Sequence, residues 1–189
     1  SQLVRSGFDV TVFDARAETA RGFVHQHGGK AATTLAEAGT GADAVIFMVP
    51  DDKVVRAVLF DNGLVDALAQ GTTVIDMSSS APAGTTAIGK DLAAKGIAYV
   101  DAPVMGGVIF AKDASLDIMA GGDAGAIDRF GEARLVVARA DGGLALVREE
   151  RRRIDLRCER SPRIEYRLRR LGEEQHAGIV FDLITIKNI

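Results

Sequence analysis

The chain has 189 residues, of which 47% are hydrophobic, and its formal net charge is −3. Such a length fits one domain, or one domain and part of another, because domains commonly have about 100 to 200 residues. No apolar run approaches the roughly 20 residues that cross a bilayer, no leader-like segment opens the chain, and the single cysteine, Cys158, cannot form an internal disulfide. These features favour a soluble protein of the reducing cytoplasm.

Strand and helix patterns alternate from the first residues to about residue 103. Residues 1–7 have the pattern of the last turns of a helix that ends at Gly7. Strands are expected within residues 8–15, 42–50, 71–80 and 97–103, and helices within residues 16–29, 51–60 and 81–96. Apolar, β-branched strands that alternate with helices predict a parallel sheet with helices on both faces. Ligands of such sheets bind outside the carboxyl ends of the strands.

The carboxyl ends of the expected strands read FDAR, MVPDD, DMSSSAP and DAPVMGG. Asp14 closes the first of them, where a dinucleotide-binding fold places an acid that accepts hydrogen bonds from ribose hydroxyls. Asp14 could equally cap the helix that follows. Arg16 could instead meet a 2′-phosphate, so the pattern leaves the choice between NAD and NADP open, with Asp14 favouring NAD.

Residues 8 to about 132 resemble the cofactor domain of the β-hydroxyacid dehydrogenases, the family of 3-hydroxyisobutyrate dehydrogenase and 6-phosphogluconate dehydrogenase. The segment DAPVMGGVIFAKDASLDIMAGGD resembles that family's substrate signature, DAPVSGG followed by G-T-L-x-I-M-x-G-G-D. VIFMVPDDKVVRAVLF and VIDMSSSAPAGT fall at the spacing of its cofactor segments. The resemblance implies a Rossmann-like, doubly wound, mostly parallel sheet. It also implies hydride transfer between a nicotinamide cofactor and a small hydroxy acid.

The resemblance assigns roles to residues at the strand ends. Cofactor contacts would come from Asp14, Arg16, Val49, Pro50 and Ser79, and substrate contacts from Met105, Gly106 and Gly107. Paired glycines let an anion approach two backbone N–H groups, although they also suit a tight turn. Met105 stands where the family usually has a serine, and a thioether cannot donate a hydrogen bond. Loss of that donor should weaken anion binding by about 1.5 to 3 kcal/mol.

Two parts that the resemblance implies are not found in the sequence. The family's G-x-G-x-x-G phosphate loop would precede Ser1, so we expect an amino-terminally truncated domain whose sheet lacks its first strand. Two strands then have unpaired edges unless another segment replaces it. The family's catalytic lysine is also absent, because arginine cannot exchange a proton and Lys187, in TIKNI, does not match the motif. We therefore assign no catalytic residue and expect an impaired or inactive oxidoreductase. The alternative is a non-catalytic binding module or a pseudoenzyme remnant.

The charge pattern changes near residue 132. Residues 1–132 carry 10 basic and 17 acidic side chains, whereas residues 133–189 carry 13 and 9. Twelve of the 17 arginines lie between Arg134 and Arg170, and no lysine lies between Lys112 and Lys187. The sequence thus predicts an incomplete cofactor-binding domain over residues 1–132 and an Arg-rich extension over residues 133–189 that matches no part of the family.

Three interpretations of the extension remain open. Clustered arginines could bind nucleic acid, but glutamates alternate with them and only Tyr166 and Phe181 could stack on bases, so this partner is not expected. VREERRRIDLRCER could form a solvated, ion-paired helix. A shifted reading frame in GC-rich coding would also produce the change in composition, and this origin is favoured.

Few other residues suggest chemistry. His25 and His27 are two apart and do not share a helix face, so we expect no metal site and interpret them as positive charge at a helix end. Asp51 and Asp52 are interpreted as acids of a helix's first turn rather than as an acid and base pair. Asp101 ends a strand and receives no role in proton transfer. The oligomeric state and the particular hydroxy acid do not follow from the sequence.

Overall fold

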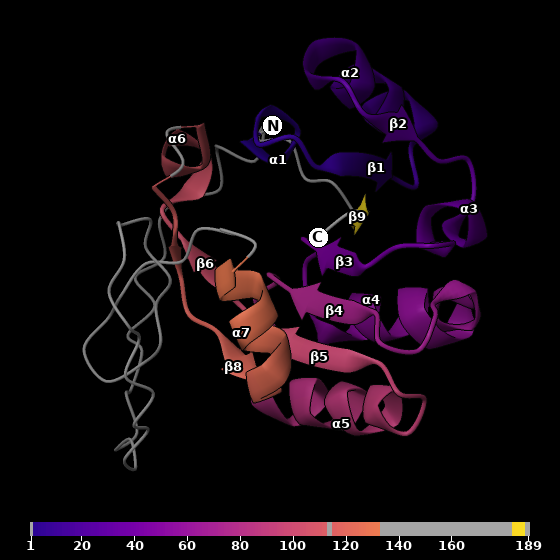
Figure 1. The fold of residues 1–189 in the computed structure, drawn as a ribbon, viewed down its shortest axis with the longest axis vertical. Coiled ribbons are helices and arrows are strands. Elements are labelled where there is room, and N and C mark those ends of the chain that lie inside the picture. The colour runs from indigo at the N-terminus through magenta and orange to yellow at the C-terminus, as the bar shows by residue number, and fades with distance from the viewer. Residues whose placement is uncertain (1, 113–114, 133–182, 188–189) are drawn as a thin grey trace.

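The computed structural model describes residues 2–112, 115–132 and 183–187. Their centre is a seven-stranded sheet in the order β2-β1-β9-β3-β4-β5-β8 (Figure 1). Its strands are β1 (Asp9–Phe13), β2 (Lys30–Ala31), β3 (Ala44–Phe47), β4 (Thr73–Asp76), β5 (Ala98–Asp101), β8 (Gly121–Gly122) and β9 (Leu183–Lys187). A separate pair is formed by β6 (Val104–Met105) and β7 (Asp117–Ile118).

The helices of the described residues include each one that the sequence predicts up to residue 96, whereas VREERRRIDLRCER lies outside the described residues. They are α1 (Gln2–Arg5), α2 (Ala17–His27), α3 (Leu35–Gly39), α4 (Asp52–Arg56), α5 (Pro82–Ala93), α6 (Gly107–Lys112) and α7 (Ala124–Glu132). A π-helical turn, Ala57–Asp61, continues α4, and a 3₁₀ turn, Leu64–Ala67, follows it. Within the described ranges, none of these helices has the length and apolar character that a membrane span requires.

Five strands of the sheet, β1 to β5, run in the same direction, and four of them end at a common edge. Phe47, Asp76 and Asp101 are register partners at the ends of β3, β4 and β5. Phe13, the last residue of β1, reaches the same level because it and Phe47 both pair with Leu183. We call the segments that follow these four ends the carboxyl rim; they are residues 14–16, 48–51, 77–81 and 102–107.

The strand β9 lies between β1 and β3 and runs antiparallel to both (Figure 1). It belongs to residues 133–189, for which the sequence predicts an Arg-rich extension that matches no part of the family. The sequence predicts two unpaired strand edges unless another segment replaces the missing first strand. In the structure β9 pairs with both edges, those of β1 and β3, and runs in the opposite direction to them. Lys187, at the other end of β9, pairs with Asp9 at the edge opposite the carboxyl rim.

Two apolar layers sandwich the sheet, as expected for a Rossmann-like fold. Alternate residues of β3 point to opposite faces, so that Val45 and Phe47 join one cluster and Ala44 and Ile46 join another. The first cluster packs against α3, α4 and α5, and the second packs against α7. A third cluster joins β1 to α2. The mostly parallel α/β sheet predicted from the sequence is thus confirmed.

Several residues considered in the sequence lie outside the described residues. They are Cys158, Tyr166, Phe181 and the arginines from Arg134 to Arg170. Of the extension, the structure describes only the segment Leu183–Lys187.

Candidate functional site at the carboxyl rim

Asp14 begins the carboxyl rim directly after β1 and is 5% exposed. Its Oδ1 accepts a hydrogen bond from the backbone N–H of Arg16 at 2.8 Å. Arg16 is itself the N-cap residue of α2, so the interpretation of Asp14 as the cap of this helix is wrong. The Oδ2 atom of Asp14 is buried and has no hydrogen-bond partner within the described part of the chain. A buried acceptor without a donor is costly, which marks Asp14 as a binding candidate.

Arg16 lies beside Asp14 but mostly in solvent. Its Nε is 3.7 Å from Oδ1 of Asp14, and its side chain is 75% exposed. At this separation and exposure the ion pair contributes little to stability. The guanidinium is therefore free to turn toward an anion near Asp14.

A second part of the rim joins the segments after β3 and β4. The N–H of Val49, which is buried, donates to Oγ of Ser78 at 3.1 Å. The N–H of Ala81 donates to Oδ1 of Asp52 at 3.1 Å. Asp51 caps α4 by accepting from the N–H of Val54, as its interpretation as a helix-start acid predicts. Asp52 has the further function of linking the starts of α4 and α5.

Asp76 organises the serine-rich segment after β4. Its carboxylate is fully buried and accepts three hydrogen bonds, from the N–H of Ser78 (2.9 Å), the hydroxyl of Ser80 (2.8 Å) and the hydroxyl of Tyr99 (2.9 Å). A buried carboxylate with both oxygens satisfied fixes the surrounding backbone. The sequence analysis missed this cluster, although an acid that ends a buried strand before three serines was a usable signal.

Two of the residues predicted to contact the cofactor lie at the surface. Pro50 and Ser79 are exposed, and each follows a buried residue, Val49 and Ser78 respectively. The buried pair Val49 and Ser78 thus holds the two segments together. The exposed neighbours are the residues that a ligand can reach.

Asp101, at the end of β5, lies beside the buried Asp76 and has an altered proton affinity. Burial, and then the charge of Asp76, raise the pKa of Asp101 to about 6. Burial and the same carboxylate also raise the pKa of the Tyr99 hydroxyl well above its ordinary value, so it stays protonated and donates to Asp76. Among the described residues next to the carboxyl rim, Asp101 is therefore the group that gains or loses its proton closest to neutral pH.

The glycine pair of the predicted substrate segment occupies backbone conformations that favour glycine. Gly106 has φ +117° and Gly107 has φ +61°. A Cβ on Gly106 would collide with the side chain of Phe110, whereas one on Gly107 would meet nothing within 4 Å. A tight turn from β6 into α6 explains both glycines. Met105, which precedes them, is 46% exposed and pairs with Asp117 of β7.

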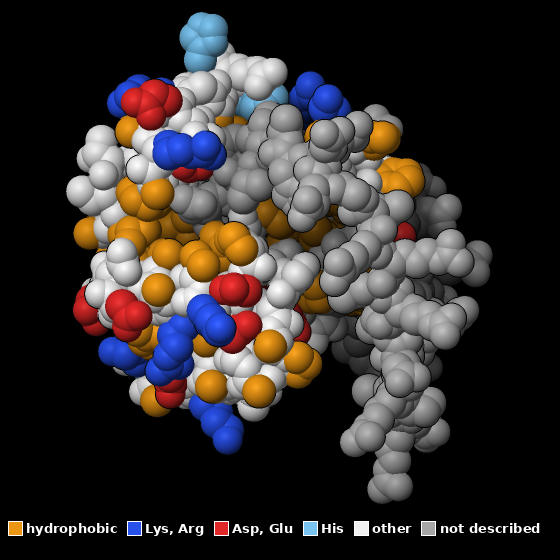
Figure 2. Space-filling model, turned by 180° about the vertical axis from the view of Figure 1, so that it is seen from behind, with side chains coloured by type: hydrophobic (Ala, Val, Ile, Leu, Met, Phe, Trp, Pro, Cys, Tyr) orange, Lys and Arg blue, Asp and Glu red, His pale blue; other side chains and the backbone are white. Residues whose placement is uncertain are grey.

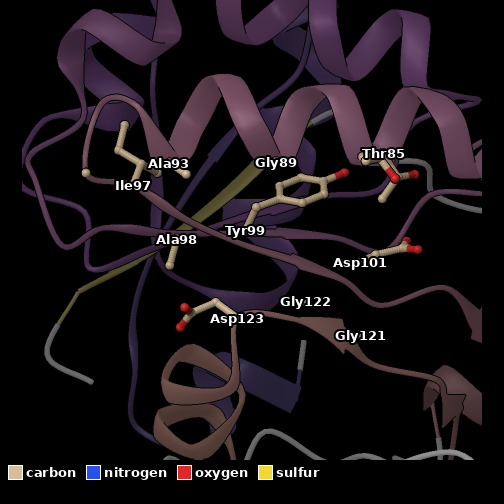
Figure 3. A pocket seen from close by; sticks show the side chains of 12 residues that line it. Thr85, Gly89, Ala93, Ile97, Ala98, Tyr99, Asp101, Gly121, Gly122 and Asp123 are labelled. Atoms are coloured by element: carbon tan, nitrogen blue, oxygen red, sulfur yellow. The ribbon is translucent and has the colours of Figure 1, made fainter.

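Two cavities lie away from the first three segments of the rim. One of about 620 Å³ lies between α5, β5 and β8 and is lined by Tyr99, Asp101 and Asp123 among others (Figure 3). Another of about 340 Å³ lies at the amino ends of β3 and β4, where Asp43 and Thr73 line it. On the face seen in Figure 2, acidic and basic side chains of the described residues are interspersed.

The histidines predicted to provide positive charge at the end of α2 do not fit that interpretation equally. His27 packs edge-on against the ring of Phe23, with 5.0 Å between centroids. Burial, followed by nearby positive charge that includes Arg5, lowers the pKa of His27. Its imidazole thus favours the neutral form, contrary to the expected cation. Because α2 begins at the rim, both histidines lie at the far end of the helix.

Comparison with known proteins agrees with this geometry. Residues 1–139 match the family described as the NAD binding domain of 6-phosphogluconate dehydrogenase. The chain is 36% identical to the NAD-dependent L-serine dehydrogenase of Pseudomonas aeruginosa, over 68% of this chain and 43% of that protein. It is 35% identical to the 3-hydroxyisobutyrate dehydrogenase of the same organism, over 72% of this chain and 45% of that protein.

A solved structure gives the same relation. The 3-hydroxyisobutyrate dehydrogenase of Mycobacterium tuberculosis, solved with L-serine, superposes with a TM-score of 0.63 at 34% identity, over 68% of this chain and 43% of that one. The present chain thus spans less than half the length of each of these relatives. Sequence, sheet topology and superposition converge, and the chain belongs to the family of NAD binding domains of 6-phosphogluconate dehydrogenase.

Proposed function

We propose that the carboxyl rim binds a nicotinamide dinucleotide, and that Asp14 accepts hydrogen bonds from its adenosine ribose. The observation that carries this proposal is the buried Oδ2 of Asp14, which has no partner among the described residues although it lies at the end of β1. A ribose hydroxyl would supply the missing donor. The residues present therefore fit the cofactor of the family to which the chain belongs.

The remaining contacts follow the order of the rim. Val49 and Pro50 would offer backbone to the cofactor, and the exposed hydroxyl of Ser79 would meet its nicotinamide side. Met105, Gly106 and Gly107 would lie at the carboxylate of a small hydroxy acid. When bound, the nicotinamide supplies the hydride acceptor or donor for the oxidation or reduction of that substrate. The Asp76 cluster holds the serine segment in place for these contacts.

NAD is the favoured dinucleotide. The carboxylate of Asp14 suits a neutral 2′-hydroxyl and repels a 2′-phosphate. Arg16 would offset that repulsion only in part, because its side chain is largely solvated. The NAD-dependent relative in Pseudomonas aeruginosa supports this preference. We expect NADH to bind more tightly than NADPH.

Turnover by this chain is expected to be low or absent. Lys187, the first lysine after Lys112 in the sequence, lies at the edge of the sheet opposite the rim. It therefore cannot donate a proton to a substrate held by Gly106 and Gly107. A non-catalytic dinucleotide-binding module is the alternative to an impaired dehydrogenase.

Titration with NADH and NADPH, followed by nicotinamide fluorescence, tests the proposal. Asp14→Ala should weaken NADH binding roughly 10- to 150-fold, because a hydrogen bond to a charged group contributes about 1.5 to 3 kcal/mol. Asp61→Ala, which removes an equal charge at the exposed end of the π-helical turn, is the matched control.

Two results would contradict the proposal. Equal NADH affinity in the parent and Asp14→Ala proteins would remove Asp14 from the site. Rapid hydride transfer with 3-hydroxyisobutyrate or L-serine would show that the chain is a competent dehydrogenase without a lysine at the rim.

A further inference from the structure

The helix α5 begins without a capping side chain of its own. Its N-cap residue is Ala81, whose side chain makes no capping hydrogen bond, and its first residue, Pro82, has no backbone N–H. The N–H of Ala81 needs an acceptor from elsewhere, because the first amides of a helix have no partner within it. That acceptor is Oδ1 of Asp52, in the first turn of α4, at 3.1 Å.

Asp52 does for α5 what a glutamate in the third helical position commonly does. In a capping box, that glutamate accepts a hydrogen bond from the N–H of the N-cap residue. The third residue of α5 is Gly84, which has no side chain that could reach back. A Cβ on Gly84 would collide with the carboxylate of Asp52. Glycine at this position thus leaves the space that a carboxylate from α4 fills.

The contact between Asp52 and Gly84 accounts for both residues. Gly84 is not among the glycines with positive φ in the described residues, and glycine inside a helix is less favourable than alanine. Its own helix therefore gives no reason for it. The carboxylate of Asp52 is likewise not needed by α4, because Asp51 already caps that helix.

The same contact holds the far end of the serine-rich segment, residues 77–81. At the start of the segment, the buried carboxylate of Asp76 accepts two of its hydrogen bonds. At its end, Asp52 accepts the N–H of Ala81. Ser79 lies between the two acids, and its side chain is exposed. Holding both ends restricts the conformations of the backbone that carries this hydroxyl.

Other contacts keep α4 and α5 together without Asp52. Nη1 of Arg56 is 2.9 Å from Oδ2 of Asp91, although both side chains are half-exposed. Val55 of α4 and Ile88 of α5 are buried in the same apolar cluster. Loss of the Asp52 carboxylate should therefore leave the helices packed and free only the start of α5.

We propose that Asp52 is a positioning residue for the nicotinamide half of the dinucleotide. It acts through the N–H of Ala81, which it holds so that the hydroxyl of Ser79 stays where it meets the nicotinamide side. The inference rests on the proposed function of the rim and adds a residue to which that proposal gives no role. The adenosine half lies at Asp14 in the proposed site, so Asp52 should affect the two halves of the ligand unequally.

Two ligands separate these halves, because ADP-ribose is the dinucleotide without its nicotinamide. In Asp52→Ala, NADH should bind about 5- to 10-fold more weakly, the factor expected for the loss of one hydrogen bond. The affinity for ADP-ribose should stay within about twofold of the parent value. Titration calorimetry measures both ligands. A general loss of structure would instead weaken the two ligands alike.

Asp91→Ala is the matched control. It removes an equal charge from the other polar link between α4 and α5 and should leave both affinities unchanged.

Two further variants restore an acceptor for the N–H of Ala81. Asp52→Asn keeps an amide oxygen at the same position. Asp52→Ala combined with Gly84→Glu supplies the acceptor from α5 itself, as in a capping box. Each should return NADH affinity to within about twofold of the parent value.

Gly84→Ala tests the shared space. Its methyl group should displace the carboxylate of Asp52, so NADH affinity should fall as in Asp52→Ala, although alanine favours the helix. In the Asp52→Ala background the same change should cost no further affinity. Circular dichroism shows whether each variant keeps its fold.

The outcomes separate the two proposals. A parent protein that binds neither NADH nor ADP-ribose overturns the dinucleotide site and this inference with it. If the parent binds both, an Asp52→Ala protein that binds both equally well, or loses affinity for both equally, overturns the positioning by Asp52 and leaves the dinucleotide site standing. Recovery of NADH affinity by neither restored acceptor overturns the part assigned to Ala81.

Discussion

At the scale of single residues, the carboxylates of Asp14 and Asp76 show how neighbouring positions acquire different functions. Asp76 has both oxygens satisfied, by donors two and four residues later and by a donor on the neighbouring strand β5. Asp14 keeps Oδ2 without a donor in the described structure. The first arrangement fixes a segment, and the second leaves capacity for a ligand. Both acids follow or end a strand, so the sequence pattern treats them alike.

The sequence predicts where the candidate site lies but not which of its side chains turn inward. Strand ends locate the rim, which is why the sequence predicts Asp14 and the serine segment. Which serine turns inward depends on the hydrogen bonds available to Asp76, because the backbone beyond a strand follows no fixed period. The predicted residue Ser79 is therefore exposed, while Ser78 is the buried anchor.

Asp101 leads to a pH prediction. Its pKa rises from 3.8 to about 6 on folding, so the folded state binds the proton more tightly than the unfolded state. Stability should therefore be greatest below pH 4 with respect to this group and fall as the pH rises through 6. Because Asp101 is only half-buried, solvent screening reduces the effect to roughly 1 to 2 kcal/mol. Urea unfolding between pH 4 and pH 8 measures it.

The variant Asp101→Asn should flatten that pH profile. Asp61→Asn, at an exposed position remote from β5, should leave the profile unchanged. A parent profile that does not decline between pH 5 and pH 7 would show that the Asp101 proton is bound equally in both states.

At the scale of elements, long apolar runs made the central strands predictable. β1, β3, β4 and β5 each lie inside a predicted range, because a buried parallel strand requires continuous apolar residues. The two-residue strands were not predicted, because two residues are too few to show the alternation of apolar and polar side chains that marks a strand. β9 escaped for another reason, because a local pattern cannot show pairing with strands that lie more than 130 residues earlier in the chain.

The turn from β6 into α6 gives a test of its two glycines. Gly106→Ala should destabilise the protein more than Gly107→Ala, because both backbones are left-handed but only the first Cβ meets Phe110. Strain of the backbone alone costs about 1 to 2 kcal/mol, and the collision adds to it. Midpoints of urea unfolding for the two variants provide the comparison.

A double variant separates strain from collision. Phe110→Ala combined with Gly106→Ala should recover the part of the loss that the collision causes. If the two substitutions are additive, the contact with Phe110 does not determine the glycine at position 106.

At the scale of the whole molecule, one apolar surface stands out among the described residues. Met105, Val108, Ile109 and Phe110 are 46%, 49%, 73% and 49% exposed, and all lie on β6 or α6. Apolar surface of this kind binds hydrophobic dyes and associates. We expect Val108→Ser with Ile109→Ser to lower dye fluorescence and self-association measured by sedimentation. Because both side chains are exposed, the midpoint of unfolding should change little, and undiminished dye binding would place the apolar surface elsewhere.

The central position of β9 also affects the order in which the molecule can form. Thr11 and Thr185 are 174 residues apart, yet they lie side by side in the middle of the sheet. Contacts of such high sequence separation slow folding, because a long loop must close before they form. During synthesis on the ribosome, β1 and β3 emerge long before their shared neighbour does. Until residue 187 is made, a nascent chain presents two open strand edges, and chaperone binding at this stage is the expected consequence.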